Sequence, residues 1–582
     1  MMSITKRIFA LLLTVALLVS VFCACNKQKE PDGTSGSTTP ESAATTPNET
    51  TPEQTTPEVP PTVDPPTTPP QKITSVHITC GSSAIESYAA AELTWYFAKK
   101  NVTLSSEGFG IELKIDADLA PKDGYRITAD EEGLVLAAGN ERGLAYGLYA
   151  FLEKFLGVHV YSPDTIVVDD GDVMIGGGVL AVYEPAFEII RNPWFPIKSL
   201  AEKDGGNVHD LDSVKTLALN AIVGGGNIQP CLTNPENLTK AIGVVKNYLR
   251  AVKNVDTLCF APATEYDLYC ECDSCAAVIA EEGSPAGIYV RFLNQLTEAV
   301  SAEYPALEYA LSIRAYLKTA PSVTKLSDKI SLRFDMSKCH ISHPITDASC
   351  PDSAALADSM RSWGKMGANI HVEYGLTATK DFIPVFANFG SLRENFRFFA
   401  ECGVDSIICD GNIVCPTGEF GELRVYLVSQ LLQNPMMSEE EYYGYMDAFL
   451  KAYYGEGWMH IREFIDLIIE LSADGHQTAD GSPFDAITKE EYEEHAAAIE
   501  AMWDKAQALA SDFANDREAY VKRARFQWRY IKLCLNPNAE DAQALITDAA
   551  SNPRVGWRPA QWNVDVEGSD LNLAPTEWAY NP

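Results

Sequence analysis

Between Pro185 and Pro435, short apolar runs alternate with stretches of helical periodicity, and this alternation restricts the fold more than any other feature of the sequence. Such a pattern is typical of parallel strands joined by crossover helices. Eight runs are interpreted as strands: Phe187–Arg191, Leu219–Val223, Ile228–Leu232, Val255–Ala261, Tyr309–Arg314, Ile330–Phe334, Ile370–Tyr374 and Ser406–Asp410. Eight strands within about 250 residues predict a (β/α)8 TIM-like barrel over residues 185–435.

A glycine run interrupts this alternation. Gly224-Gly225-Gly226 leads almost directly from the second run to the third and leaves no room for a helix between them. Because no Gly-Lys-Ser/Thr sequence follows, the run favours a turn over a phosphate-binding loop. The barrel is therefore expected to be irregular at this point.

The chain on either side predicts two further domains of an α/β protein. Residues 72–180 combine strand-like runs with two amphipathic stretches, and Gly157 stands where a glycine commonly ends a helix, so a small N-terminal α/β domain is expected. Residues 436–582 predict a helical C-terminal domain. Its expected helices are Glu439–Tyr454, Trp458–Ser472, Lys489–Ala510 and Asp516–Cys534, and its core aromatics are Trp503, Phe526, Trp528 and Tyr530.

The first residues have the pattern of an export signal. Lys6 and Arg7 precede an apolar run, residues 8–22, that is too short to span a membrane comfortably. Ala24 directly before Cys25 resembles a lipoprotein signal, which implies cleavage after Ala24 and lipidation of Cys25. A plain secretory signal is the alternative.

A polar tether is expected after the signal segment, residues 1–25. Residues 26–71 are rich in Thr and Pro, bury no core and are expected to be disordered. We therefore expect the folded part on the extracellular face of the cell membrane, held only by a lipid anchor. The net charge of −35, from 80 acidic and 45 basic residues, excludes nucleic acid as an expected partner, because a phosphate backbone would be repelled.

Three cysteines follow the fourth strand with the spacing C-x-C-x-x-C. They are Cys270, Cys272 and Cys275, and Cys231 near the third strand could complete a set of four. Four thiolates are a common ligand set for structural zinc, whereas disulfides suit an exported protein. Both interpretations stay open, and no cofactor is expected to be required for activity.

Carboxylates stand at the predicted strand ends, where a parallel barrel has its active site. Glycosidic cleavage needs two carboxyl groups, one protonated and one ionised. Glu265 is the candidate acid, and Glu373 or Asp410 the candidate nucleophile or base. Residues that could bind sugar rings, hydroxyls or a carboxylate are Arg191, Trp194, Tyr266, Arg314, Tyr316, His343, Tyr374, Glu419 and Arg424. His340 and His343, beside Cys339, could instead ligate a metal, although a loop histidine more often does neither.

Motifs in the first two domains resemble known families. G-Y-R-I-T at residues 124–128 and G-N-E-R-G-L-A-Y-G at residues 139–147 are similar to the α/β domain that precedes the barrel in β-hexosaminidases and α-glucuronidases. In the barrel region, C-L-T-N-P, E-Y-D-L-Y-C-E-C-D-S-C and G-E-F-G-E-L-R-V-Y-L resemble the bacterial family called domain of unknown function 4838. That family has no established reaction, and it usually has Asp where this chain has Glu265 and Glu373. The resemblance implies a barrel whose architectural relatives are glycoside hydrolases.

The sequence thus predicts an extracellular glycoside hydrolase that acts on poly- or oligosaccharide by a two-carboxylate mechanism. A glycan-binding lipoprotein that kept the barrel and lost catalysis is the alternative, because fold does not determine function. A metal-dependent hydrolase built on the thiols is less favoured, since four sulfur ligands make a closed structural site.

Overall fold

The computed structural model describes most of the chain between residues 68 and 551. The described ranges are 68–118, 123–162, 165–191, 214–218, 222–223, 229–262, 268–314, 317–376, 378, 383–410, 420–479, 481–510 and 517–551. The expected signal segment and nearly all of the tether lie outside these ranges, so their roles stay predictions. Predicted site residues outside the described ranges are Cys25, Trp194, Glu265, Tyr266, Tyr316 and Glu419.

The N-terminal domain is a seven-stranded mixed sheet with the order β1-β9-β5-β6-β4-β2-β3. Its strands are β1 (Thr68–Lys72), β2 (Ser75–Cys80), β3 (Thr103–Leu104), β4 (Phe109–Ile115), β5 (Tyr125–Ala129), β6 (Gly133–Ala138) and β9 (Met174–Tyr183). A separate hairpin pairs β7 (Val158–Ser162) with β8 (Thr165–Val168). The small α/β domain expected from the sequence is therefore present, and it begins slightly earlier, because β1 pairs with β9 where the tether was expected to continue.

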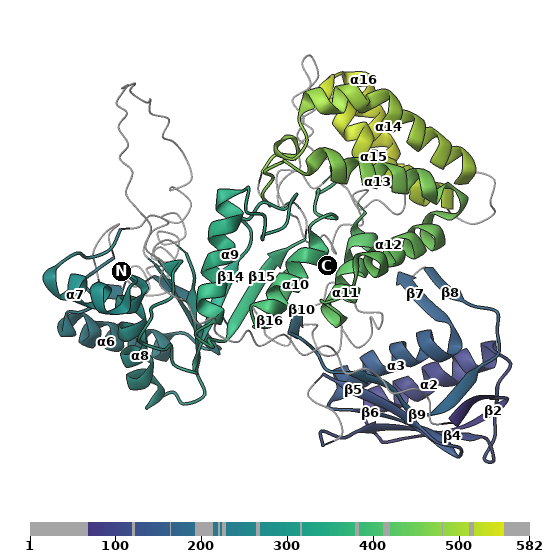
Figure 1. Cartoon of the computed structure of the whole chain (residues 1–582), viewed down its shortest axis with the longest axis horizontal. Helices are drawn as coiled ribbons and strands as arrows, with labels where there is room; N and C mark the ends of the chain where they lie inside the picture. Colours follow the sequence, from purple (N-terminus) through teal and green to yellow (C-terminus); the bar gives the residue numbers. More distant parts are fainter. Residues whose placement is uncertain are drawn as a thin grey trace, which may run out of the picture. The chain divides into compact units, whose positions relative to one another are not determined.

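Helices α2 (Ala84–Lys99) and α3 (Glu141–Leu156) cover one face of this sheet (Figure 1). Ser83 caps α2 through a capping box with Glu86, which satisfies backbone N–H groups that have no partner within the helix. The expected end of α3 is confirmed at Gly157, whose φ of 62° is costly for any residue with a Cβ.

The central region forms a second seven-stranded sheet in which every pair is parallel, with the order β10-β16-β15-β14-β13-β12-β11. Its strands are β10 (Glu188–Arg191), β11 (Val214–Ala218), β12 (Thr257–Ala261), β13 (Glu308–Ser312), β14 (Ile330–Asp335), β15 (Ile370–Gly375) and β16 (Val404–Asp410). The first strand pairs with the last and the others follow in sequence, which is the cyclic order of a barrel. Among the described residues no pairing joins β10 to β11, so we describe a parallel α/β sheet rather than a closed barrel.

Two of the eight predicted strands are wrong. Ile222 and Val223 are helical, and β11 lies just before the predicted run. The described part of the other run, residues 229–232, contains no strand. Pro230 lies inside that run and has no N–H for a strand ladder, so the run forms a loop instead. Both errors fall beside the glycine run where an irregularity was expected.

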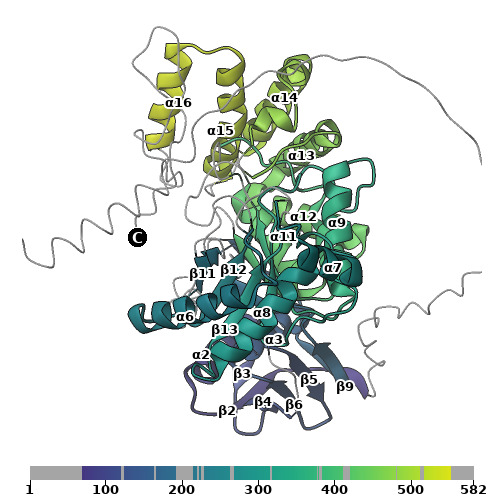
Figure 2. The same cartoon turned by 90° about the vertical axis from the view of Figure 1, so that its left-hand side faces the viewer.

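Helices follow most of the described strands of the parallel sheet, and α6 and α8 pack side by side (Figure 2). They are α6 (Pro235–Ala251), α7 (Asp273–Glu282), α8 (Ala286–Ser301), α9 (Pro351–Gly364), α10 (Leu392–Glu401) and α11 (Gly421–Gln433). No helix in the described ranges is both long enough and apolar enough to cross a membrane.

The C-terminal region is helical, as predicted. Its elements are α12 (Glu439–Tyr454), η3 (Gly455–Gly457), α13 (Trp458–Ser472), η4 (Pro483–Asp485), α14 (Lys489–Ala510), α15 (Arg517–Leu535) and α16 (Ala539–Ser551). The aromatics predicted for the core are buried. One apolar cluster joins helices α12 to α15 to the parallel sheet and includes Phe334 of β14 and Trp528 of α15. The buried residues of α16 form a second cluster with Phe526 and Tyr530 of α15. At the start of α11, Phe420 has a φ of 61° and stacks on Trp503 of α14 with ring centroids 6.3 Å apart.

Candidate active site

The two faces of the parallel sheet differ in chemistry. Alternate residues of a strand point to opposite faces. On β14 and β15, Leu332, Phe334, Val372 and Tyr374 belong to the apolar core. The opposite face carries mostly polar residues on neighbouring strands: Ser331, Arg333, Asp335, His371 and Glu373. The sheet therefore has one face for the helices and another that can support chemistry.

An ion pair lies near the carboxyl ends of these strands. Arg333 Nη1 donates to Glu373 Oε1 at 2.8 Å, and the side chains are 17% and 36% exposed. Asp335 is the register partner of Glu373, so the two carboxylates occupy neighbouring strands on the same face. Asp335 also accepts a hydrogen bond from Ser337 N at 2.8 Å, which orients it at the end of β14. These three side chains are the best-defined candidates for catalysis among the described residues.

Deeper residues of the same face support this group. Burial raises the pKa of the Cys259 thiol on β12, while the charges of Arg333 and Arg314 act in the opposite direction. His371 Nδ1 and Ser406 Oγ form a hydrogen bond of 2.7 Å between β15 and β16. The charged edge thus rests on a polar layer that spans several strands.

Two of the predicted catalytic residues lie on strands of the parallel sheet. Glu373 is partly exposed on β15, and Asp410 closes β16, although nothing is described of the Asp410 side chain. In backbone register, Glu373 lies beside Ile408, which lies beside Arg191 of β10. Arg314, two residues past β13, is close enough to influence Cys259. The roles of these residues in catalysis or sugar binding stay predictions.

Two predicted sugar-binding residues have structural positions instead. Tyr374 is 1% exposed, its ring packs against Phe399, and its hydroxyl accepts a hydrogen bond from Asn395 Nδ2 at 2.9 Å. It points to the helix-covered face because it is adjacent to Glu373 in the strand. Arg424 is also 1% exposed, and it donates to Asn388 Oδ1 and Phe386 O at 2.9 Å each. Neither side chain presents a surface to a ligand.

His343 likewise differs from its predicted role. Its ring is 4% exposed, and Nδ1 lies 3.3 Å from the carbonyl oxygen of Pro344. A ring enclosed in this way cannot lie against a sugar in solution.

Arg333 was missed as a site residue, although the sequence contains a signal for it. The run I-S-L-R-F-D alternates apolar and polar residues, whereas a strand covered on both faces would be apolar throughout. The polar positions of the run mark the face on which the charged group lies. Asp335 is the last polar position of the same run, and as a carboxylate at a predicted strand end it was a candidate from the sequence.

The four predicted thiols come together in space. Cys231 lies in the loop before α6, Cys270 and Cys272 precede α7, and Cys275 lies in its first turn. Their sulfur atoms all lie within 4.8 Å of one another, and all four are free thiols. Cys231 Sγ is 3.7 Å from Cys272 Sγ and 3.8 Å from Cys275 Sγ. Tetrahedral zinc with bonds of about 2.3 Å requires sulfur separations of about 3.8 Å.

Contacts of the backbone and of one threonine side chain join the loops that carry these thiols. Gln229 N donates to Leu268 O at 3.0 Å and joins the two loops, while Thr233 Oγ1 lies 3.3 Å from the sulfurs of both Cys231 and Cys275. The backbone N–H of Cys275 and the neighbouring thiols lower the pKa of Cys272 to about 6. Burial raises the pKa of Cys275 to about 12. The set fits a soft divalent cation, which would deprotonate the remaining thiols.

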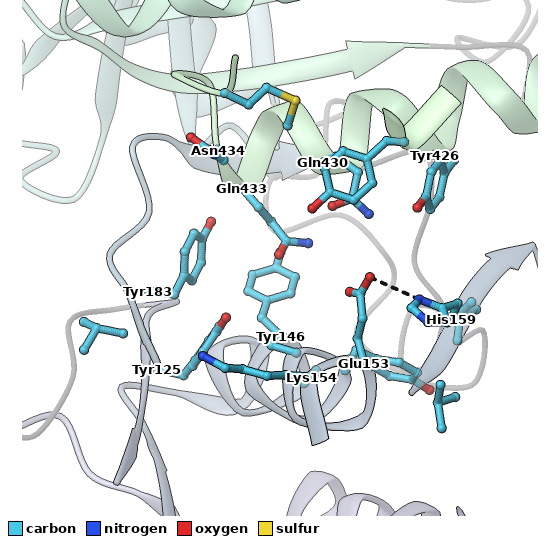
Figure 3. Close-up of a pocket in the computed structure, with 18 residues that line it drawn as sticks. Tyr125, Tyr146, Glu153, Lys154, His159, Tyr183, Tyr426, Gln430, Gln433 and Asn434 are labelled. Carbon is cyan, nitrogen blue, oxygen red and sulfur yellow. Dashed lines mark ion pairs between the residues drawn. The ribbon is translucent and has the colours of Figure 1, made fainter. Parts of the chain in front are cut away.

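A cavity of about 350 Å³ lies elsewhere, among α3, β7 and α11. Figure 3 shows several tyrosines around it and an ion pair between Glu153 and His159, 3.4 Å apart. The interaction with Glu153 raises the pKa of His159. The residues of α11 that line the cavity include Gln433 and lie toward the end of the helix. Since a crossover helix runs antiparallel to its strand, this end lies away from the strand ends that carry Glu373.

The central sequence matches a known family model. Residues 219–466 match Domain of unknown function (DUF4838). This match covers less than half of the chain. The DUF4838 region contains β12 to β16, the Arg333–Glu373 pair and all four clustered thiols. No curated protein matches the sequence significantly.

Solved structures that align with the chain include glycoside hydrolases. A GH20 β-N-acetylhexosaminidase from Streptomyces coelicolor A3(2) aligns with a TM-score of 0.34 and 12% identity, over 68% of this chain and 94% of that chain. A GH115 4-O-methyl-α-glucuronidase with specificity for decorated arabinogalactans has a TM-score of 0.44 and 10% identity, over 83% and 76%. A GH138 enzyme targeting pectin rhamnogalacturonan II has a TM-score of 0.34 and 10% identity, over 82% and 90%.

Proposed function

We propose that this chain is an extracellular carbohydrate-active enzyme that hydrolyses glycosidic bonds with two carboxyl groups. The observation that carries the proposal is the Arg333–Glu373 pair near the carboxyl ends of a parallel sheet, with Asp335 beside it on the same face. Active sites of parallel α/β proteins form at this edge. Carboxylates of different environment at one edge are the groups that glycosidic hydrolysis requires.

The ion pair suggests a division of roles between the carboxyl groups. A guanidinium in contact with a carboxylate favours its charged form, so Glu373 suits the nucleophile or base rather than the acid. Glu265 follows β12, which is separated from β15 by β13 and β14. Strand ends this far apart in the sheet leave room for a sugar between the two carboxyl groups, which the two-carboxylate mechanism requires. We therefore assign the acid to Glu265, and Asp410 remains a second candidate for the base.

We propose that cations and aromatic rings around this edge recognise the substrate. Arg314 lies near Cys259 of the polar face, and Arg191 lies on β10, the strand that pairs with β16. Trp194, Tyr266 and Tyr316 follow strands in the sequence and are proposed to stack on sugar rings. A location on the outer surface of the cell, through lipidation of Cys25, would give the enzyme access to large glycans.

The decisive experiment measures sugar released by the full chain from a panel of aryl glycosides and natural glycans. On a substrate that the wild type cleaves, Glu373→Gln should lower turnover by roughly 100-fold or more. Glu303→Gln is the matched control. Like Glu373, Glu303 is a partly exposed glutamate in ion pairs, here with Lys246 and Arg250, but its partners lie on helix α6 and not on a strand of the sheet. Binding of a glycan without any hydrolysis would instead support the non-catalytic alternative.

We also propose a structural zinc ion on Cys231, Cys270, Cys272 and Cys275. Support comes from the sulfur separations and from the two loops that meet there. Four protein ligands leave no open position for substrate, so this ion would stabilise the loops beside the site rather than take part in hydrolysis.

A further inference from the structure

A second group of metal-ligating side chains lies outside the proposed active site and the thiol cluster. It consists of His340, His343, Cys350 and His476, whose ligand atoms all lie within 4.8 Å of one another. The first two follow β14, Cys350 precedes α9, and His476 follows α13. Residues from distant parts of the sequence thus converge on one point.

The distances within this group fit a shared ion. His340 Nδ1 lies 3.0 Å from His476 Nδ1 and 3.2 Å from Cys350 Sγ, and Cys350 Sγ lies 3.9 Å from His476 Nδ1. A tetrahedral zinc with nitrogen at about 2.0 Å and sulfur at about 2.3 Å separates its ligands by about 3.3 to 3.6 Å. The observed distances lie on either side of these values.

The orientation of His343 supports the same conclusion. Its Nδ1 faces the carbonyl oxygen of Pro344 at 3.3 Å and Asp347 Oδ2 at 3.9 Å. Its Nε2 is therefore on the other side of the ring, and this atom is buried without a hydrogen-bond partner. A buried polar atom of this kind is costly unless something binds it. Metal-ligating histidines commonly have one nitrogen on the ion and the other on a carbonyl or carboxylate.

The backbone holds the ligands in place. Ile341 N donates to Gln477 O at 2.9 Å, and Ser342 Oγ donates to Gly475 O at 2.7 Å. His476 N in turn donates to Asp485 O at 2.8 Å. The loop after β14 and the loop after α13 are thus joined beside the ligands, so that an ion would meet a preorganised site.

We propose that His340, His343, Cys350 and His476 bind one zinc ion, which fastens the loop after β14 to the loop after α13. Three imidazoles and one thiolate are a ligand set that zinc accepts, and four protein ligands make a closed site. The ion is therefore structural. It lies at the carboxyl side of β14, the strand that carries Arg333 and Asp335, so it would also steady that edge of the proposed active site.

Zinc content of the purified full chain tests the proposal, with folding checked by circular dichroism. His476→Ala should lower the content by one equivalent per chain whatever the thiol cluster holds, and the exposed position of His476 favours a folded variant. His460→Ala is the control, because His460 on α13 pairs with Glu463 and does not belong to the group of four ligands. Equal zinc content in wild type, His476→Ala and His460→Ala would overturn the proposal.

A second measurement needs no variant. Diethylpyrocarbonate modifies exposed imidazole nitrogens that bear a lone pair, and mass spectrometry locates the modified residues. Zinc should protect the exposed His476 several-fold relative to the chelated protein, while His460 should react equally in both states. Equal reactivity of His476 with and without zinc would also overturn the proposal.

Discussion

Arg333 and Glu373 form a diagonal pair across two adjacent parallel strands. In register, Arg333 lies opposite His371 and Asp335 lies opposite Glu373, yet the Arg333 guanidinium reaches Glu373 Oε1 at 2.8 Å. The guanidinium therefore extends one row toward the strand ends and contacts the carboxylate on the next strand. This position lets one cation offset the charge of neighbouring carboxylates.

Removal of that cation should impair hydrolysis. We expect Arg333→Ala to reduce kcat by roughly 100-fold, because Glu373 loses the group that orients it and balances its charge. Arg333→Lys should recover part of the loss, since lysine keeps the charge but not the planar geometry. Arg250→Ala, which breaks an exposed ion pair with Glu303, should leave kcat unchanged. Steady-state kinetics on a cleaved glycoside would check these values, and an active Arg333→Ala would rule out the assigned role.

If Glu265 is the general acid, the loss of turnover in a Glu265 variant should depend on the leaving group of the substrate. Glu265→Gln should lower turnover by roughly 100-fold on natural glycans, because the departing oxygen is not protonated. Activated aryl glycosides should suffer less, since their leaving groups need little protonation. If Glu265→Gln, Glu373→Gln and Asp410→Asn all retain wild-type turnover, these carboxyl groups have no catalytic role.

The thiol cluster predicts a loss of zinc and of stability in one variant. Cys275→Ser should remove one equivalent of zinc per chain and lower the Tm, because its buried sulfur can no longer hold the loops before α6 and α7. Cys80→Ser changes an exposed free thiol of the N-terminal domain and should alter neither quantity. Metal analysis and a thiol titration after denaturation would separate zinc from disulfides. Four reactive thiols with no bound metal would contradict both.

Substitution of two adjacent glutamates should destabilise the protein to very different extents. The fully buried Glu282 accepts hydrogen bonds from Thr324 N at 2.9 Å and Arg291 Nε at 2.6 Å. Burial alone would raise the pKa of Glu282, but hydrogen bonds from Thr324 and Arg291 outweigh it, so the pKa is lowered. We expect Glu282→Gln to cost about 3 kcal/mol of unfolding free energy. Glu281 contacts the same arginine but is 57% exposed, so Glu281→Gln should cost under about 0.5 kcal/mol.

The same carboxylate predicts a pH dependence. Because the pKa of Glu282 is lower in the folded state, its stabilising effect is present above the unfolded value, about 4.3, and is lost as the pH falls through the folded value. The free energies of unfolding of wild type and Glu282→Gln, measured by denaturant titration, should therefore become similar as the pH falls below about 4. A difference that persists unchanged at low pH would show that packing, rather than charge, is responsible.

The signal segment predicts how the protein is retained. Cys25→Ser should release the protein into the medium, because the lipidated residue is lost, and globomycin should make a precursor accumulate in the wild type. Cell fractionation with immunoblotting would measure both effects. Normal processing in globomycin, together with no greater release of Cys25→Ser, would support a plain secretory signal.

Much of the secondary structure was predictable because local pattern and tertiary burial agree. The bounds of α12, α13 and α14 match the predicted segments, since their apolar residues recur at helical spacing and face a core. Strands β12 to β16 were also found near the predicted runs. The pattern was insufficient near β11, where the run of residues 228–232 was interrupted by Pro230.

The candidate site was less predictable, because the type of a residue does not specify the face of the sheet to which its side chain points. Glu373 and Tyr374 are adjacent and both have types suited to a sugar site, yet they point to opposite faces of the sheet. Similarly, His343 was recognisable as a loop histidine, but its partner His476 lies far away in the sequence. Cysteine spacing was more informative, because three of the four clustered thiols lie within one short motif.

The apolar cluster that joins the parallel sheet to the C-terminal helices has a consequence for unfolding. Phe420 stacks on Trp503 across this boundary, and one apolar cluster of described residues includes both the sheet and helices α12 to α15. The N-terminal domain, by contrast, has a largely separate core. The sheet and the helices should therefore melt together in a single calorimetric transition, and a fragment cut at Pro435 would expose a wide apolar surface and aggregate.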